Sequence, residues 1–372
     1  MNNNQASFFA LLRAGLWEQS IRLLPLGKID YAELYDIADE QSVVGLIAAG
    51  IEHVEDLKIL KQEARPFLAK VFSLESRNVA MNTFIKDLLG RMRSFGINPL
   101  LVKGQGVAQC YSRPLWRSSG DIDLLLDPAC YEKAKMLLIP LASSVETEEV
   151  AYKHFGVSID SWHVELHGTL HSGLSGRINR MLDTIQDDSC SRGSARVWNN
   201  GGFDVFLPNA NNDVIFIFSH ILQHFFHGGI GLRQICDWCR LLWKYHSDID
   251  VNLLKQRIKK MRLMSEWKAF GCLAVKYLGL STEVMPLYDR SFERQGDRVM
   301  SLILAKGNFG HNDERGNASE PSTIKRKLIT IGRQLRENAS IFRIFPLDSC
   351  RFLWRFFYDG FKRTRTVTKL EH

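Results

Sequence analysis

The stretch Gly120-Asp121-Ile122-Asp123-Leu124-Leu125-Leu126 decides the fold of this chain. Its apolar residues predict a short buried strand over residues 122–126. Alternate side chains of a strand share a face, so Asp121 and Asp123 point to one side while Ile122 and Leu124 enter the core. Two such carboxylates, about 6 to 7 Å apart along the strand, can jointly coordinate Mg²⁺ or another hard divalent cation. The alternative is a strand with two solvated carboxylates, and on either interpretation we expect Asp123 to be exposed.

Upstream of this strand, a lysine and two glycines follow a second apolar run. Residues 97–102 predict a buried strand, and Lys103-Gly104-Gln105-Gly106 leads into a short helix over residues 105–111. Glycine lets the backbone approach a phosphate closely, and a helix N-terminus offers free N–H donors. The G-x-x-x-x-G-K-[ST] spacing of a Walker P-loop is absent. We predict phosphate contacts from Lys103, Gly104, Arg117 and Ser119.

Downstream, His163-Val164-Glu165-Leu166-His167 predicts a strand with its polar side chains on one face. This strand and residues 155–159 are expected to form an antiparallel pair joined by residues 160–162. The third carboxylate, that of Glu165, would complete a site for two metal ions beside the aspartate pair.

In this order, the motifs resemble those of the uncharacterised bacterial nucleotidyltransferase family within the DNA polymerase beta superfamily. In that family an L-L-K-G turn precedes R-x-x-D-I-D-L-L-V, and a later D/E-L-H strand supplies the third acid. The resemblance covers residues 74–280, and its matching positions are Lys103, Gly104, Arg117, Asp121, Asp123, Glu165 and His167. One departure is the absence of the serine that touches a phosphate in relatives, because Gly104-Gln105 stands where the wider superfamily has Gly-Ser or Gly-Gly.

The resemblance implies an α+β fold, with a small α/β nucleotidyltransferase domain, built on a mixed sheet, between N-terminal and C-terminal helical domains. It also implies transfer of a nucleoside monophosphate (NMP) from a nucleoside triphosphate (NTP) to a hydroxyl or phosphate. The acceptor is not identified by the sequence, and we expect a small molecule, a glycan or a protein. Mg²⁺ or Mn²⁺ would be held by Asp121, Asp123 and Glu165. The alternative is a catalytically silent module of the same fold that binds nucleotide or a partner.

Three histidines form a second polar group on an apolar helical stretch. His220, His224 and His227 recur at i, i+4 and i+7, so they line one helix face. This spacing suits ligands to Zn²⁺ or Fe²⁺ and leaves open a metal hydrolase, whereas hydrogen bonds to neighbouring loops or substrate contacts are the alternative. The spacing of Arg233 and Asp237 predicts an i, i+4 ion pair unless both face a cleft.

A cleft is expected between the sheet and this helical stretch, because one shallow sheet cannot enclose both base and acceptor. A helix face bearing these polar residues would be costly to bury without partners, so we predict that it faces Asp121 and Asp123. The residues predicted to line the cleft are His167, His220, His224 and Arg233.

The patterning divides the chain into a helical region (1–95), the nucleotidyltransferase core (96–208), a helical domain (209–285) and a C-terminal helical arm (286–369). Residues 307–322 predict a loop, and residues 370–372 resemble the stump of a cloning tag. The net charge of +7 arises in the arm, where residues 325–369 hold twelve Lys and Arg against three acids. Because the arm is also rich in aromatic residues, it predicts an amphipathic helix that packs on the protein's own core or touches a membrane surface. Binding of nucleic acid by the arm is the alternative that we do not favour.

The composition is that of a globular protein, with 45% hydrophobic and 24% charged residues. No apolar run approaches the roughly 18 to 20 residues of a membrane span, and the N-terminus lacks a signal peptide pattern. Seven scattered cysteines fit reduced thiols, and the C-x-x-C pair at Cys236 and Cys239 lies in an apolar helical run that predicts burial. We therefore expect a cytoplasmic protein without a transmembrane segment.

Overall fold

The chain begins with four helices, as its periodic apolar pattern predicts. The computed structural model describes residues 2–191, 195–227, 229–306, 339–347, 349–351 and 353–354. The first helices are α1 (Asn3–Trp17), α2 (Tyr31–Glu40), α3 (Val44–Glu52) and α4 (Lys61–Ser94), with the 3₁₀ turn η1 (Leu24–Leu26) between α1 and α2. The Asp30 side chain caps α2 by accepting hydrogen bonds from two backbone N–H groups, as expected of a helix-start residue.

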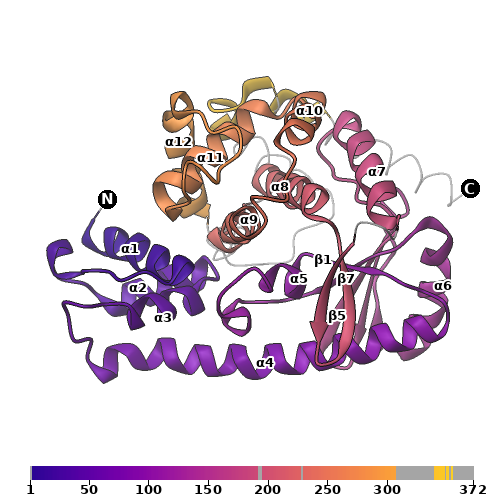
Figure 1. The fold of residues 1–372 in the computed structure, drawn as a ribbon, viewed down its shortest axis with the longest axis horizontal. Helices are drawn as coiled ribbons and strands as arrows, with labels where there is room; N and C mark the ends of the chain where they lie inside the picture. Colours follow the sequence, from indigo (N-terminus) through magenta and orange to yellow (C-terminus); the bar gives the residue numbers. More distant parts are fainter. Residues whose placement is uncertain are drawn as a thin grey trace, which may run out of the picture.

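The long helix α4 joins the N-terminal helices to the sheet and runs beneath both in Figure 1. Its first half contributes Phe67 and Val71 to the core of the helical part. Its second half contributes Met81, Ile85 and Met92 to the core beneath the sheet. One helix therefore buries side chains in both hydrophobic cores.

The central sheet has five strands in the order β1-β2-β5-β4-β3, and β2 and β5 run parallel while the other pairs are antiparallel. A separate hairpin pairs β6 with β7. The sheet is therefore mixed, and with its many helices the chain has the predicted α+β fold. The strands are β1 (Leu100–Val102), β2 (Ile122–Leu125), β3 (Ser144–Val145), β4 (His154–Ile159), β5 (Trp162–His167), β6 (Arg196–Asn200) and β7 (Phe203–Leu207).

Short helices connect the strands. One of them, α7, was not predicted from the sequence. These elements are α5 (Gly104–Ala108), η2 (Pro114–Trp116), α6 (Pro128–Leu138), η3 (Ile139–Leu141) and α7 (Gly176–Cys190).

The two faces of the sheet differ in character. Ile122 and Leu124 of β2 lie in the core with α4 and α6, as do Val164 and Leu166 of β5. The alternate residue Leu125 instead joins the core that contains α8. Because side chains alternate along a strand, Asp123 of β2 and Glu165 of β5 lie on the face opposite to α4 and α6, the same face as Leu125.

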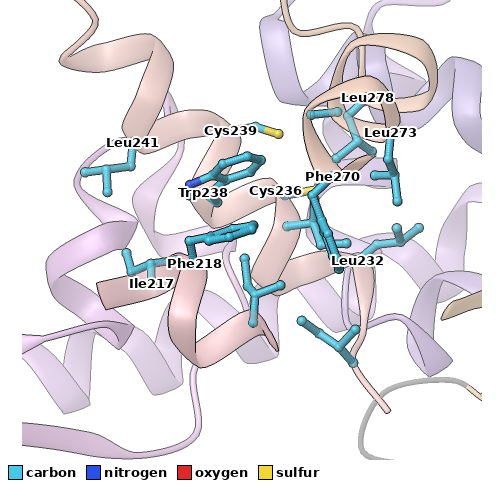
Figure 2. Packing of buried hydrophobic residues seen from close by; sticks show 14 of the residues in the cluster. Ile217, Phe218, Leu232, Cys236, Trp238, Cys239, Leu241, Phe270, Leu273 and Leu278 are labelled. Carbon is cyan, nitrogen blue, oxygen red and sulfur yellow. The ribbon is translucent and has the colours of Figure 1, made fainter. Parts of the chain in front are cut away.

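Five helices form the second half of the described chain: α8 (Ala210–His227), α9 (Leu232–Lys244), α10 (Val251–Met261), α11 (Met264–Leu278) and α12 (Glu293–Lys306), the last preceded by η4 (Arg290–Phe292). Figure 2 shows their aromatic core, in which the Phe218 ring stacks 5.2 Å from Trp238 and meets Phe270 at 5.8 Å. Cys236 and Cys239 are buried free thiols there, as predicted. Burial raises the pKa of both thiols, which makes them inert.

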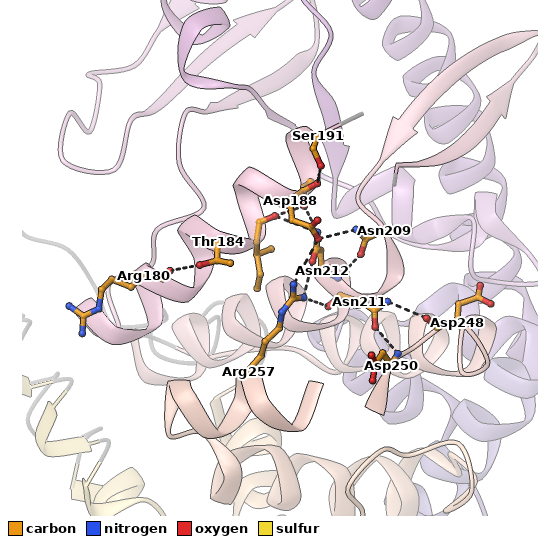
Figure 3. A network of polar contacts seen from close by, with 12 residues as sticks. Arg180, Thr184, Asp188, Ser191, Asn209, Asn211, Asn212, Asp248, Asp250 and Arg257 are labelled. Atoms are coloured by element: carbon orange, nitrogen blue, oxygen red, sulfur yellow. Dashed lines mark hydrogen bonds and ion pairs between the residues drawn. The ribbon is translucent and has the colours of Figure 1, made fainter. Parts of the chain in front are cut away.

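A polar network fastens α7, α8 and α10 to one another (Figure 3). Arg257 donates to the side-chain oxygen of Asn212 at 2.9 Å, and Asn212 donates to Asp188 at 2.9 Å. Asn211 donates to the Asp248 carbonyl and accepts from the Asp250 N–H. These contacts fix the start of α8, the helix that carries the three histidines.

Some predictions concern residues outside the described ranges. The predicted loop 307–322 and most of the basic arm lie there, although Ile341 and Phe345 of the arm are buried in the helical core. The proposed domain boundaries stay a prediction. Within the described residues, no helix combines the length and the apolar character that crossing a membrane requires.

Candidate active site

Asp123 and Glu165 lie side by side on the parallel strands β2 and β5, where they are direct register partners. The prediction that Asp123 is exposed is wrong, since only 6% of it is accessible. The Lys103 ammonium lies 2.6 Å from its Oδ1, and the His167 Nε2 lies 2.8 Å from the same oxygen. Burial of this carboxylate is therefore compensated by a lysine and an imidazole.

Asp121 precedes β2 and is exposed, unlike Asp123. Partial desolvation of its carboxylate raises the pKa of Asp121, and the negative charges of Glu165 and Asp123 raise it further. Asp123 and Glu165 are therefore adjacent in the structure, and Asp121 lies near enough for both charges to raise its pKa. That the three acids share metal ions stays a prediction.

Two histidines hold Glu165. Its Oε2 lies 3.0 Å from the His154 Nε2 and 3.5 Å from the His167 Nε2. Burial alone would raise the pKa of Glu165, but these contacts and the charge of Lys103 lower it far below its usual range. Glu165 is therefore ionised. His154 was not among the residues singled out from the sequence.

Lys103 links β1 to α5 in an unusual backbone conformation. Its φ is 57°, and Gly104 follows with a φ of 39°. A Cβ at Gly104 would lie 3.3 Å from the Asp121 carbonyl oxygen, so the Lys-Gly turn packs closely on the strand with the aspartates. Burial alone would lower the pKa of Lys103, but Asp123 and Glu165 raise it. Non-glycine residues with positive φ are often found at functional sites.

Arg117 connects the loop before Asp121 to helix α9. Its Nε and Nη2 donate to the two carboxylate oxygens of Asp237 at 2.7 and 2.6 Å, and its Nη1 donates to the Ser119 hydroxyl at 2.9 Å. Tyr111 adds a third hydrogen bond to Asp237 at 2.7 Å. All three guanidinium nitrogens thus have partners, which gives Arg117 a positioning role. Its predicted contact with phosphate stays a prediction.

Arg233 does not form the i, i+4 ion pair with Asp237, because Asp237 accepts from Arg117 instead. Its Nη1 donates to the Ser118 carbonyl oxygen at 3.0 Å, while its buried Nε has no acceptor among the described residues. Burial lowers the pKa of Arg233, as does the charge of Arg117, whereas Asp121 acts in the opposite direction. The hydrogen bond to Ser118 places the Arg233 guanidinium against the loop that precedes Asp121.

The histidines of α8 separate into a pair and a single residue. The Nε2 atoms of His220 and His224 are 3.1 Å apart, so one imidazole donates to the other. His227 instead contacts the Gln223 carbonyl oxygen at 2.8 Å. Burial lowers the pKa of His220, and so does Lys103, while Glu165 opposes this shift. The three histidines therefore do not form one group of ligands, and the orientation of the pair toward Asp121 and Asp123 stays a prediction.

We expect the stability of the protein to fall as the pH drops from 6.5 toward 4, partly through His224. Burial lowers the pKa of His224 from 6.5 to about 4, with a further contribution from Lys103. The unfolded state therefore binds a proton between these values that the folded state does not, which costs on the order of 3 kcal/mol at the lower end. In urea unfolding across this pH range, His224→Gln should flatten the slope. The control is His246→Gln at an exposed histidine, and it should leave the slope of stability against pH as in the wild type. Equal slopes for His224→Gln and the wild type would contradict the role given to His224.

The mixed sheet and its carboxylates agree with the nucleotidyltransferase class that the sequence resembles. Residues 27–279, more than half of the chain, match the family described as uncharacterised nucleotidyltransferase, and the protein belongs to this family. None of the curated proteins matches the chain. A crystal structure of an antigenic nucleotidyltransferase-like protein from Paracoccidioides brasiliensis is similar over 57% of this chain and 96% of that chain, with 13% identity and a TM-score of 0.35.

Proposed function

We propose that the protein transfers an NMP from an NTP to a hydroxyl or phosphate of an acceptor, in a reaction that depends on divalent metal. The observation that carries this proposal is the adjacency of Asp123 and Glu165 on parallel strands, with Asp121 close enough for its pKa to respond to both. The like charges of the three acids repel one another; Lys103, His154 and His167 offset this in part, and bound divalent cations would offset it further.

The donor set fits hard divalent cations such as Mg²⁺ or Mn²⁺, because carboxylate oxygens are their usual protein ligands. Asp121 and Asp123 would hold both ions, and Glu165 would hold the one nearer the acceptor. When bound, such ions neutralise phosphate charge and lower the pKa of an attacking hydroxyl.

Lys103 and Arg233 supply cationic groups for the triphosphate in this proposal. Lys103 pairs with Asp123 and can exchange this partner for a phosphate oxygen, since its ammonium is a compact point charge on a flexible stem. The buried Arg233 Nε without an acceptor favours an anion beside it. Ser119, which Arg117 holds in place, adds a hydroxyl.

The α8 face that bears His220 and His224 is the proposed acceptor side. Both imidazoles are neutral near pH 7, because burial lowers the pKa of each. A neutral imidazole can accept a proton from an acceptor hydroxyl or orient it by a hydrogen bond.

Arg233→Lys is expected to raise the KM for the NTP about tenfold with little change in kcat. Lysine keeps the charge but loses the planar fork of donors, and tenfold corresponds to about 1.4 kcal/mol. Steady-state kinetics checks this prediction. The control is Arg22→Lys, at a side chain that is 74% exposed and pairs with Asp56. An unchanged KM in Arg233→Lys would exclude Arg233 from nucleotide binding.

The proposed function is tested by incubating the protein with each common NTP labelled in the α-phosphate, Mg²⁺ and a cell extract. Label carried onto an acceptor identifies both the preferred base and the acceptor class. Nucleotide binding without transfer in any extract would instead support the silent module.

A further inference from the structure

We infer that the site also binds a first-row transition-metal ion through His154, Glu165 and His167. This inference deepens the proposed function, because it names the ion at the Glu165 side of the site. In this arrangement the metal site formed by Asp121 and Asp123 has oxygen ligands only. The metal site at Glu165 has two imidazole nitrogens in addition to the carboxylate.

The strand register brings the three side chains together. His154 on β4 is the direct partner of His167 on β5, and Glu165 lies two residues before His167, so all three share one face. Their ligand atoms all lie within 4.8 Å of one another. Among the described residues, no other group of three or more His, Cys, Asp or Glu meets this criterion.

The distances suit a metal ion with short bonds. Four-coordinate bonds of about 2.1 Å place neighbouring ligand atoms roughly 3.4 Å apart. The Glu165 Oε2 lies 3.0 Å from the His154 Nε2 and 3.5 Å from the His167 Nε2. The ligand nitrogens of His154 and His167 lie within 4.8 Å of each other, so side-chain movement that brings them closer lets all three atoms bind one ion.

The ligand types decide the class of ion. Two imidazoles and one carboxylate are typical of Zn²⁺, Fe²⁺, Co²⁺ and Mn²⁺ sites, whereas Mg²⁺ is bound by oxygen. The three side chains are 29%, 22% and 14% exposed, so an ion can reach them and keep a coordination position toward a substrate. Two further side chains adjoin the group. The Asp123 Oδ1 lies 2.8 Å from the His167 Nε2, and the His163 Nε2 lies 3.6 Å from the other Glu165 oxygen and 3.8 Å from Glu146.

The experiment titrates the purified full-length protein with Co²⁺ as the probe, followed by visible absorption and calorimetry, and in parallel with Mg²⁺. We expect saturable binding of Co²⁺ with a visible band. His154→Ala should weaken Co²⁺ binding at least about tenfold, since even loss of an outer-shell partner costs about 10- to 100-fold. It should weaken Mg²⁺ binding less than Co²⁺ binding, because Mg²⁺ loses only a residue that holds Glu165 and not a ligand. His154→Gln, which keeps a donor toward Glu165, should give the same loss if the fold is retained in both variants by circular dichroism.

The matched control is His163→Ala, which removes a neighbouring imidazole and should leave Co²⁺ binding unchanged. Equal losses in the His163 and His154 variants, no loss in the His154 variants, or no saturable Co²⁺ binding would overturn the inference. If Co²⁺ does not bind but Mg²⁺ supports NMP transfer, the inference fails and the proposed function stands. If Co²⁺ binds as expected and no metal supports transfer, the inference stands and the proposed function fails.

Discussion

Asp121→Asn is expected to reduce metal-dependent NTP turnover at least 100-fold without lowering stability. Asp121 is exposed, and partial desolvation together with the charges of Glu165 and Asp123 raises the pKa of its carboxyl group, so removing its charge does not destabilise the fold. The same change removes a charged metal ligand, and a 100-fold loss corresponds to about 2.7 kcal/mol of transition-state stabilisation. Turnover is measured as pyrophosphate release at saturating Mg²⁺, together with the melting temperature.

The matched control for this variant is Asp160→Asn. Asp160 lies in the turn between β4 and β5 with a φ of 53°, a conformation that asparagine tolerates well. Loss of one negative charge there should change neither turnover nor stability. Full activity in Asp121→Asn would contradict the metal-binding role of this carboxylate.

Asp237→Asn is expected to lower the free energy of unfolding by about 3 to 5 kcal/mol. The Asp237 carboxylate accepts two hydrogen bonds from Arg117 and one from Tyr111, and both members of the ion pair are buried. Breaking such a pair leaves a buried guanidinium without its counter-charge, which is the costly outcome. Urea unfolding with an unchanged m-value measures the loss.

The exposed ion pair between Lys70 and Asp39 supplies the control for this substitution. Its atoms are 2.8 Å apart, but the two side chains are 36% and 49% exposed. Asp39→Asn should therefore cost less than about 1 kcal/mol. A similarly small cost for Asp237→Asn would show that Arg117 is held in place by other contacts.

The alternation of apolar and polar residues was sufficient to predict the strands that carry Asp123 and Glu165. The alternation in residues 120–126 placed Ile122 and Leu124 in the core, and both are buried there. The short helix predicted over residues 105–111 is also present, as α5 (Gly104–Ala108), whereas α7 was missed. The family resemblance then supplied the relation between β2 and β5, which alternation alone does not determine.

Contacts between distant segments could not be predicted in this way. Asp123 is contacted by Lys103 and by His167, which lie 20 and 44 residues away in the sequence. Arg117 likewise pairs with the distant Asp237. His154 is a different case, since a signal was present. A two-residue turn between β4 and β5 fixes the register that places His154 opposite His167.

The central claim, transfer of an NMP, is tested most directly by following two labels in matched reactions. The protein is incubated with Mg²⁺, an acceptor-containing extract and an NTP labelled either in the α-phosphate or in the γ-phosphate. The account predicts that the α-label moves to the acceptor, that the γ-label leaves in pyrophosphate, and that Asp121→Asn slows both at least about 100-fold. Appearance of the γ-label on the acceptor, or release of the γ-label as inorganic phosphate without transfer of the α-label, would contradict it.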